Sequence, residues 1–268
     1  MASPDSTFVK RYRLPIFELF RRHPVISAII IFAIDVAIEL IVGLFAKSLV
    51  PPIPMLPDFI ALCVLVVGVI ALVTFLGWWK VVGCNPPSEW RNLALLLLPT
   101  VLVFLPLLGG FKAVDAGTVV FLLVGYLLTG FHEETLHRGV ILRVLQPTGV
   151  WPSVLISSLL FGLAHSANLF LHFSGSPVIV GLQMIGAFTF GIGMAALRLR
   201  TNTIWPLLLL HAASDMFLAV GKLPVLLASP IEDTVLLIFG IVLIVGMLRK
   251  QRAKTEMAEP LNTDEPVA

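Results

Sequence analysis

The sequence predicts an all-helical, polytopic membrane protein: a bundle of eight transmembrane helices with both termini in the cytoplasm. Three observations predict this fold class. Of the 268 residues, 58% are hydrophobic and only 13% are charged, and the mean hydropathy is +0.99, which leaves too little polar surface for a soluble protein. The apolar residues form eight stretches long enough to cross a bilayer. The basic residues are divided unevenly between the segments that join these stretches.

The eight stretches follow from the thickness of the membrane. A bilayer core of roughly 30 Å needs about 20 apolar residues per helix. The expected spans, in order, are 24–46, 58–79, 92–111, 117–143, 152–171, 177–197, 204–220 and 231–248. Proline-rich or Gly/Ser/Pro segments follow the first, second and fifth spans and support their ends. The first span is too long for a signal peptide and no cleavage pattern accompanies it, so we expect a retained helix.

The lysines and arginines give the orientation, because cytoplasmic loops attract them. With the N-terminus inside, cytoplasmic segments hold 15 of the 18 basic residues, and the outer loops hold only Lys47, Lys112 and Lys222. If one span were miscounted, the basic residues would be spread more evenly between the two sides of the membrane. The expected organisation is a cytoplasmic N-terminal segment (1–23), an eight-helix domain (24–248) with a motif core at 117–220, and a disordered cytoplasmic tail (249–268).

The same composition excludes several classes of protein. Nucleic-acid binding needs a basic face, whereas the basic residues here are scattered singly between apolar runs. Cys63 lies inside an apolar run and Cys84 in a loop, so we expect no disulfide framework. The sequence has no Gly-rich phosphate loop and no internal repeat. The expected partners are therefore the lipid bilayer and a membrane-associated molecule.

Ionisable side chains inside the spans are the functional candidates, because each is costly in lipid unless it pairs or faces a wet cavity. They are Asp35 and Glu39 in the first span, His132, Glu133, Glu134, His137 and Arg138 in the fourth, His165 in the fifth, and His211 and Asp215 in the seventh. A lone histidine in a membrane helix is more often a hydrogen-bond partner than a catalyst. A set of polar turns on three helices is harder to explain as packing.

The depths of these groups allow a shared site. At about 1.5 Å per residue, Glu133 lies about 15 Å from the cytoplasmic end of its span and His165 about 20 Å. His211 and Asp215 lie about 10 and 17 Å deep, and because they are four residues apart they share a helix face. All four fall within one slab of the membrane. We interpret them as one functional polar site.

The two adjacent glutamates are expected to differ in role. Glu134 and Arg138 stand four residues apart and can form an ion pair one turn apart. Glu133 is rotated from Glu134 by about 100° and can point into a cavity instead. A carboxylate in an apolar, partly dry pocket gains proton affinity, which suits a general base that takes a proton from water.

The segment from His132 to His137 looks like a zinc-protease motif, and we reject that interpretation. In that motif the two histidines are four residues apart, whereas here they are five apart. On an α-helix five residues turn the second histidine by about 140°, too far for both to bind one metal. We expect His132 and His137 to be cavity or interface residues. For Asp35 and Glu39, which have no base beside them, we expect a structural role facing water or a helix, with contact to a cation or substrate as the lesser alternative.

Three motifs in the spans resemble those of a known family. They read Glu133-Glu134-Thr135-Leu136-His137-Arg138, Phe161-Gly162-Leu163-Ala164-His165 and His211-Ala212-Ala213-Ser214-Asp215. This set is similar to the EExxxR, FxxxH and HxxxN/D motifs of the CAAX prenyl protease and bacteriocin-processing (CPBP) family, the type II CAAX endopeptidases. The resemblance covers residues 133–215, and the outer spans match only in being hydrophobic.

The resemblance implies hydrolysis of a peptide bond in the membrane. Glu133 and His165 would activate water, His211 and Asp215 would stabilise the oxyanion or bind a metal, and Glu134 with Arg138 would form a structural ion pair, with Phe161 as motif support. The third motif commonly ends in Asn, whose amide can donate to an oxyanion. Asp215 donates only when protonated, but it is the better metal ligand. Asp215 therefore slightly favours a zinc-type site of Glu133, His165, His211 and Asp215 with a metal-bound water, and a metal-free mechanism stays open as the near alternative.

The sequence therefore predicts an intramembrane endopeptidase that cleaves near a membrane-embedded or lipid-modified end of its substrate, with Glu133 as general base. The substrate would be a membrane-associated peptide or protein, and prenylated substrates are one alternative. Two other classes remain: a non-proteolytic interaction or immunity protein that retains the fold, and a proton-coupled transporter, which would need broken helix pairs that the sequence lacks. Short loops and the lack of an organelle address favour a prokaryotic plasma membrane.

Overall fold

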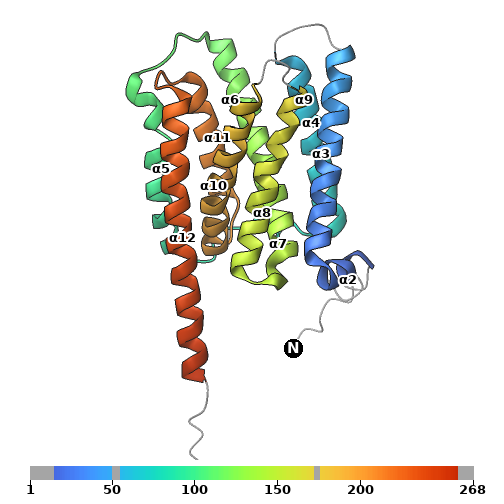
Figure 1. Cartoon of the computed structure of the whole chain (residues 1–268), viewed down its shortest axis with the longest axis vertical. Helices are drawn as coiled ribbons and strands as arrows, with labels where there is room; N and C mark the ends of the chain where they lie inside the picture. The colour runs from blue at the N-terminus through green and yellow to red at the C-terminus, as the bar shows by residue number, and fades with distance from the viewer. Residues whose placement is uncertain (1–14, 50–54, 172–175, 259–268) are drawn as a thin grey trace, which may run out of the picture.

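The structure, a computed structural model, describes residues 15–49, 55–171 and 176–258, and these form helices without a β-strand (Figure 1). The longer helices are α2 (Pro15–Arg22), α3 (Pro24–Leu49), α4 (Leu56–Leu76), α6 (Ala116–Glu133), α8 (Val150–Ala164), α10 (Pro177–Thr201), α11 (Trp205–Val220) and α12 (Val225–Ala258). Short helical segments are η1 (Trp90–Leu96), α5 (Leu97–Leu102), η2 (Leu105–Gly109), η3 (Glu134–Ile141), α7 (Leu142–Leu145), η4 (Gln146–Thr148), η5 (His165–Ala167) and α9 (Asn168–Leu171). The all-helical fold is thus confirmed.

Seven helical stretches of the described residues are long and apolar enough to cross a membrane. They coincide with seven of the predicted spans. The remaining predicted span, 204–220, is the helix α11, which has 16 residues and a length of about 24 Å, short of a full hydrocarbon core. The chain is therefore an integral membrane protein with at least seven apolar helices, while the count of eight spans and the orientation remain predictions.

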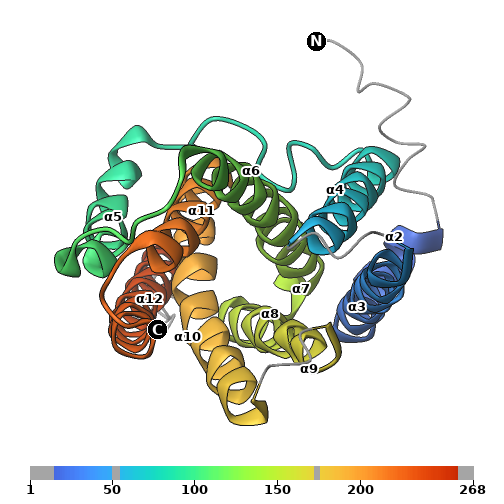
Figure 2. The ribbon, with the colours of Figure 1, turned by 90° about the horizontal axis from the view of Figure 1, so that it is seen from above.

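Six helices surround the middle of the bundle. Seen from above, α3, α4, α6, α11, α10 and α8 follow one another in a ring, and α5 and α12 lie outside it beside α10 and α11 (Figure 2). Small residues bring neighbouring helices close, as is usual in membranes. A Cβ atom added to Gly191 of α10 would lie 3.0 Å from the side chain of Ser158 of α8, and one added to Gly240 of α12 would lie 2.9 Å from Gly193 of α10.

The two ends of the bundle differ. At one end, here called the α2 end, lie α2 and the C-terminal part of α12 (Figure 1). Phe17 and Phe20 of α2 pack on Trp78, each with ring centroids 5.7 Å from it, which ties α2 to the segment after α4. At the opposite or far end, Phe111 and Gly221 form an isolated antiparallel bridge beside the start of α6. The first and last described residues thus lie at the same end.

Two element boundaries differ from the sequence prediction. α12 continues to Ala258, although residues from 249 onward were expected to be disordered; residues 249–258 are rich in Arg, Lys, Gln and Ala, which are good helix formers. Residues 259–268 lie outside the described part. The predicted span 92–111 is built from three short segments, η1, α5 and η2, because Pro99 and Pro106 cannot donate the backbone hydrogen bonds of a continuous helix.

Asp115 starts the helix that carries the two glutamates. Its side chain accepts hydrogen bonds from the backbone N–H of Thr118, at 3.0 Å, and from the Thr118 hydroxyl, at 2.5 Å. These bonds to Thr118, first the hydroxyl and then the backbone, hold the pKa of the exposed Asp115 carboxyl below its usual value. This N-cap satisfies one of the free backbone donors of α6 and fixes where the helix begins.

Candidate active site

The helix that carries Glu133 changes its winding directly after that residue. α6 ends at Glu133, and the next eight residues, Glu134–Ile141, form the π-helix η3, all of them buried. A π-helix shifts the backbone hydrogen bonds from i→i−4 to i→i−5, and such segments occur often at functional sites. The carbonyl of His137 within η3 accepts a hydrogen bond from the Ser157 hydroxyl of α8, at 2.9 Å. Packing against α8 therefore supports the altered winding.

Glu134 is fully buried and contacts two cationic or potentially cationic groups. Its Oε1 atom lies 3.1 Å from Nη1 of Arg138, one turn along the same helix, and 2.8 Å from Nδ1 of His211 on α11. A carboxylate only accepts hydrogen bonds. The Nδ1 atom of His211 therefore carries a proton and donates a hydrogen bond to Glu134. Glu134 thus fixes the ring orientation of His211, and the Nε2 atom points to the other side.

That other side of His211 faces two more carboxylates. Its Nε2 atom lies 3.4 Å from Oε2 of Glu133 and 3.7 Å from Oδ2 of Asp215, one turn further along α11. The side chain of His211 is 7% exposed and those of Glu133 and Asp215 are 24% and 32% exposed. The structure therefore brings together Glu133, His211 and Asp215, with the histidine buried and the carboxylates open to the interior.

His165 lies where α8 ends and η5 begins. Its Nδ1 atom is 3.0 Å from the carbonyl oxygen of Phe161. Because a carbonyl oxygen only accepts, Nδ1 is the protonated nitrogen, and the Nε2 atom of a neutral His165 keeps a free lone pair. No hydrogen bond or ion pair joins His165 to Glu133, His211 or Asp215 among the described residues; the four line the same cavity.

The ring of Phe161 is the common packing partner of the site. The rings of His137, His165 and His211 meet it edge-on, with centroids 5.1, 5.1 and 5.9 Å away. The guanidinium of Arg138 lies over its face, 3.9 Å from the centroid, in a cation–π contact. Phe161 therefore sets the positions of three imidazoles and of the cation that pairs with Glu134.

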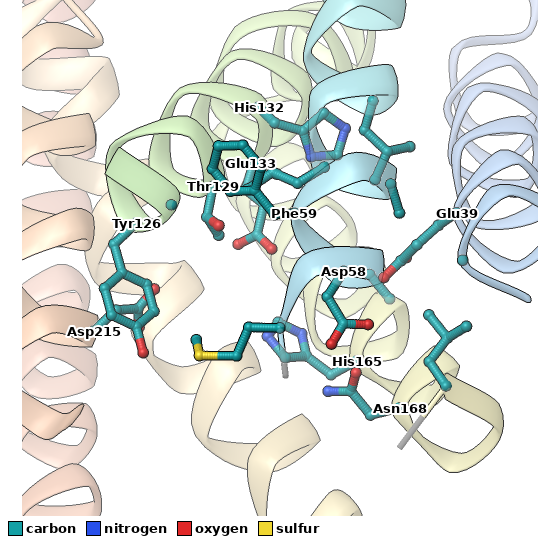
Figure 3. Close-up of a pocket in the computed structure, with 18 of the residues that line it drawn as sticks. Glu39, Asp58, Phe59, Tyr126, Thr129, His132, Glu133, His165, Asn168 and Asp215 are labelled. Atoms are coloured by element: carbon teal, nitrogen blue, oxygen red, sulfur yellow. The ribbon is translucent and has the colours of Figure 1, made fainter. Parts of the chain in front are cut away.

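A cavity of about 760 Å³ gives access to these groups. It is bounded by residues of α3, α4, α6, α8, α9 and α11, and Figure 3 shows Glu133, His165 and Asp215 on its wall. Its lining also includes Met55, Leu218 and Val225, which lie next to the far end of the bundle. The site is thus reached from the far end, through the interior of the ring of helices.

Both histidines of the rejected zinc motif, His132 and His137, line this cavity. The angle expected for a five-residue spacing assumed an α-helix throughout, and that assumption is wrong for η3, whose wider turns bring residues five apart closer to one face. The five-residue spacing alone therefore does not exclude that these two histidines lie near one face of the helix. His137 is 2% exposed, and its Nδ1 atom has no hydrogen-bond partner among the described residues.

Asp35 and Glu39 also line the cavity, so they belong to the same polar interior as the three motifs. The sequence shows no basic residue beside Asp35 on its own helix. The structure supplies one from another helix, since Nε2 of His132 lies 3.0 Å from Oδ1 of Asp35. Sequence reasoning missed Tyr126 and Thr129, which line the cavity on α6. They precede Glu133 by seven and four residues, and this helical spacing was the signal that could have found them.

The same geometry bears on the metal alternative. Among the described residues, no group of three or more His, Cys, Asp and Glu side chains is arranged to hold one metal ion. His165, one of the four expected ligands, makes no hydrogen bond or ion pair with the other three groups among the described residues. These side chains do not fit a ligand set as they stand, so no step below depends on a metal.

A cavity inside an apolar bundle that gathers carboxylates and imidazoles from separate helices defines a membrane-embedded acid–base site. Residues 115–217 of the chain match the family model described as "Type II CAAX prenyl endopeptidase Rce1-like". All three motifs lie inside the matched residues, so the match confirms the resemblance seen in the sequence. That family is a family of proteases. No curated protein and no solved structure matches the chain.

Proposed function

We propose that the chain is an intramembrane endopeptidase that hydrolyses a peptide bond near a membrane-embedded or lipid-modified end of its substrate. The observation that supports this most is the contact between Glu133 and His211, which brings a partly exposed carboxylate and a buried imidazole from two helices to the wall of one cavity. The family match, whose description names an endopeptidase, adds support for proteolysis. A prokaryotic plasma membrane, eight spans and cytoplasmic termini complete the proposal.

Glu133 acts as the general base. Its carboxylate faces the cavity and can take a proton from a water molecule while the water oxygen attacks the carbonyl carbon of the substrate. His165 assists, because its Nε2 lone pair can accept a hydrogen bond from the same water when Nδ1 donates to Phe161. The proton held by Glu133 is then delivered to the nitrogen of the leaving amine as the C–N bond breaks.

His211 stabilises the oxyanion that forms during attack. Its Nδ1 proton is held by Glu134, so a proton on Nε2 points into the region between Glu133 and Asp215. An N–H aimed at a developing negative charge in a site with little water is the usual source of oxyanion stabilisation. Asp215 supports this role by attracting the protonated imidazole, and it donates a hydrogen bond itself only when it is protonated.

Replacement of the base tests the proposal. Glu133→Ala and Glu133→Gln should each lower proteolysis of membrane-tethered reporter peptides at least ~100-fold, the usual contribution of a general base, while the melting temperature in detergent stays close to that of the unchanged chain. Glu89→Gln, an exposed carboxylate far along the sequence from the motifs, is the matched control. Full activity of the Glu133 variants would refute the assignment.

The metal alternative has its own test. Elemental analysis of the purified chain, with activity measured before and after treatment with a chelator, distinguishes the two mechanisms. On the geometry above we expect no stoichiometric metal and unchanged activity. A stoichiometric divalent metal whose removal abolishes activity would establish the metal-dependent form. A cleavage-dead Glu133 variant that keeps its cellular function would favour the interaction or immunity protein instead.

A further inference from the structure

Acids and histidines from several helices are the ionisable residues of the cavity lining. Its ionisable lining residues are Asp35, Glu39, Asp58, Glu133 and Asp215 with His132, His137, His165 and His211. No Lys or Arg is found among the lining residues that the structure describes. The segments 50–54 and 172–175, which lie outside the described residues, contain neither Lys nor Arg in their sequence. Five carboxylates without a lysine or arginine make the interior suited to a positive charge.

Four of the five carboxylates already face a partner. Asp35 contacts His132 at 3.0 Å, and Lys47 lies 3.5 Å from Asp58. Glu133 and Asp215 both face Nε2 of His211. Glu39 is the exception, since it makes no hydrogen bond or ion pair with a described residue. Figure 3 shows its side chain reaching from α3 into the pocket, on the side where Asp58 lies.

Glu39 lies on the path between the cavity entrance and Glu133. It follows Asp35 by one turn of α3, about 6 Å along the helix axis, and α3 runs from the α2 end to the far end (Figure 1). Glu39 therefore lies between the Asp35–His132 pair and the far end from which the cavity is reached. His132, which pairs with Asp35, directly precedes Glu133 in the chain. A substrate group held by Glu39 would therefore lie within a few substrate residues of the peptide bond that is placed at Glu133.

A second residue that lines the cavity also has a polar atom without a partner among the described residues. His137 lines the cavity at 2% exposure, and its Nδ1 atom has no hydrogen-bond partner among the described residues. A buried polar atom without a partner destabilises the protein until a ligand or water satisfies it. The unpartnered carboxylate and the unpartnered imidazole thus lie on walls of the same cavity.

We infer that Glu39 binds a cationic group of the substrate, a lysine side chain or an N-terminal ammonium, within a few residues of the scissile bond. This inference rests on the proposed function. An ammonium replaces the missing partner of a carboxylate that sits inside a membrane-spanning helix, where an unpaired charge is costly. A substrate that instead carried its free C-terminal carboxylate into the cavity would meet the five carboxylates of the lining, with imidazole groups as its partners among the described lining residues.

Binding of short probe peptides tests this inference without requiring cleavage. The chain is placed in nanodiscs of neutral phosphatidylcholine, and four fluorescent, leucine-rich tetrapeptides are compared by anisotropy. The first is capped at both ends and contains one lysine. The second replaces that lysine by norleucine, the third leaves the N-terminus of the norleucine peptide free, and the fourth leaves its C-terminus free. Mass spectrometry verifies that the probes stay intact.

The lysine peptide, the free-amine peptide or both should bind about tenfold more tightly than the capped norleucine peptide, as expected for one charged hydrogen bond. Comparison of these two peptides distinguishes a side-chain cation from an N-terminal one. Glu39→Gln should remove this preference and leave the affinity for the norleucine peptide unchanged, whereas Glu89→Gln keeps the preference.

Equal binding of all four probes, tighter binding of the free-carboxylate peptide, or a preference that survives Glu39→Gln would overturn the inference. The proposed function fails separately, if the Glu133 variants still cleave the reporter peptides.

Discussion

At the scale of single residues, two neighbouring glutamates have different surroundings. Glu134 is completely buried and its Oε1 atom contacts both Arg138 and His211, whereas Glu133 is partly exposed to the cavity. The difference arises because adjacent residues of a helix point about 100° apart. One carboxylate can therefore hold the bundle together while the next one stays available for chemistry.

This difference predicts opposite consequences for the same substitution at the two positions. Glu134→Ala leaves the buried guanidinium of Arg138 without its partner, which should lower the free energy of unfolding by about 3–5 kcal/mol. Glu133→Ala should change it by about 1 kcal/mol or less, because that side chain is partly solvated. Thermal unfolding of the two variants in the same detergent, followed by circular dichroism, measures the contrast. Equal stability of both variants would contradict the assigned roles.

Much of the site at this scale could be predicted, because its pairs follow helical spacing. The Glu134–Arg138 and His211–Asp215 pairs are separated by four residues, which places each pair on one face. Contacts between helices could not be predicted in the same way. The hydrogen bond from His211 to Glu134 spans 77 residues of sequence and depends on how α6 and α11 pack, which no local pattern records.

At the scale of elements, a glycine determines how closely α8 approaches α10. A Cβ atom added to Gly162 would lie 2.7 Å from the carbonyl oxygen of Met184 and 3.1 Å from the side chain of Phe188, both on α10. The first of these is backbone and cannot move aside alone. Gly162 lies between Phe161 and His165, so the same close approach holds the motif of α8 in position.

Gly162→Ala should therefore push α8 away from α10. We expect a loss of about 1–3 kcal/mol in stability, typical of overpacking, together with a lower rate of proteolysis because Phe161 and His165 move. Gly68→Ala in α4 is the matched control, since nothing lies within 4 Å of its added Cβ and alanine is the better helix former by about 1 kcal/mol. Melting temperatures and initial rates of the two variants check this. A Gly162→Ala variant as stable and active as the control would refute the packing argument.

The winding of the π-helix η3 could not be predicted from the sequence. Its residues fit an α-helical pattern as well as a π-helical one, and the choice between them depends on contacts such as that of Ser157 with the His137 carbonyl. The existence and approximate positions of the long apolar helices were predictable, because they depend on composition along a single segment, whereas limits such as those of α12 were not. The winding of the active-site turn depends on its neighbours.

At the scale of the whole molecule, the cavity entrance and the first and last described helices lie at opposite ends of the bundle (Figure 1). α2 and the last turns of α12 are at the α2 end (Figure 1), while the cavity lining extends to residues beside the far end. If the basic residues orient the bundle in the usual way, the cavity is reached from the outer face of the membrane. Sequence predicted the orientation and a polar cavity beside Glu133, but not which helices bound the cavity or where it opens, since its walls come from helices distant in the chain.

The orientation can be measured with single cysteines in a background in which Cys63 and Cys84 are replaced by alanine. Ser176→Cys, at the exposed N-cap of α10, should react with a membrane-impermeant maleimide added to intact cells. Ser88→Cys is exposed as well, but it follows α4 near the α2 end and should react only in inside-out vesicles. Mass shifts on a gel report both reactions. The reverse pattern would place the termini outside and the cavity entrance in the cytoplasm.

The double contact of Glu134 also bears on how the molecule is made. A newly inserted chain has α6 and α11 in the bilayer before they have met, and His211 then lacks the acceptor that orients its ring. The reactive constellation comes into being only when these two helices dock. Under the proposed function, copies in which these helices have not yet docked would be inert toward neighbouring polypeptides, and hydrolytic capacity would appear only at this last stage of assembly.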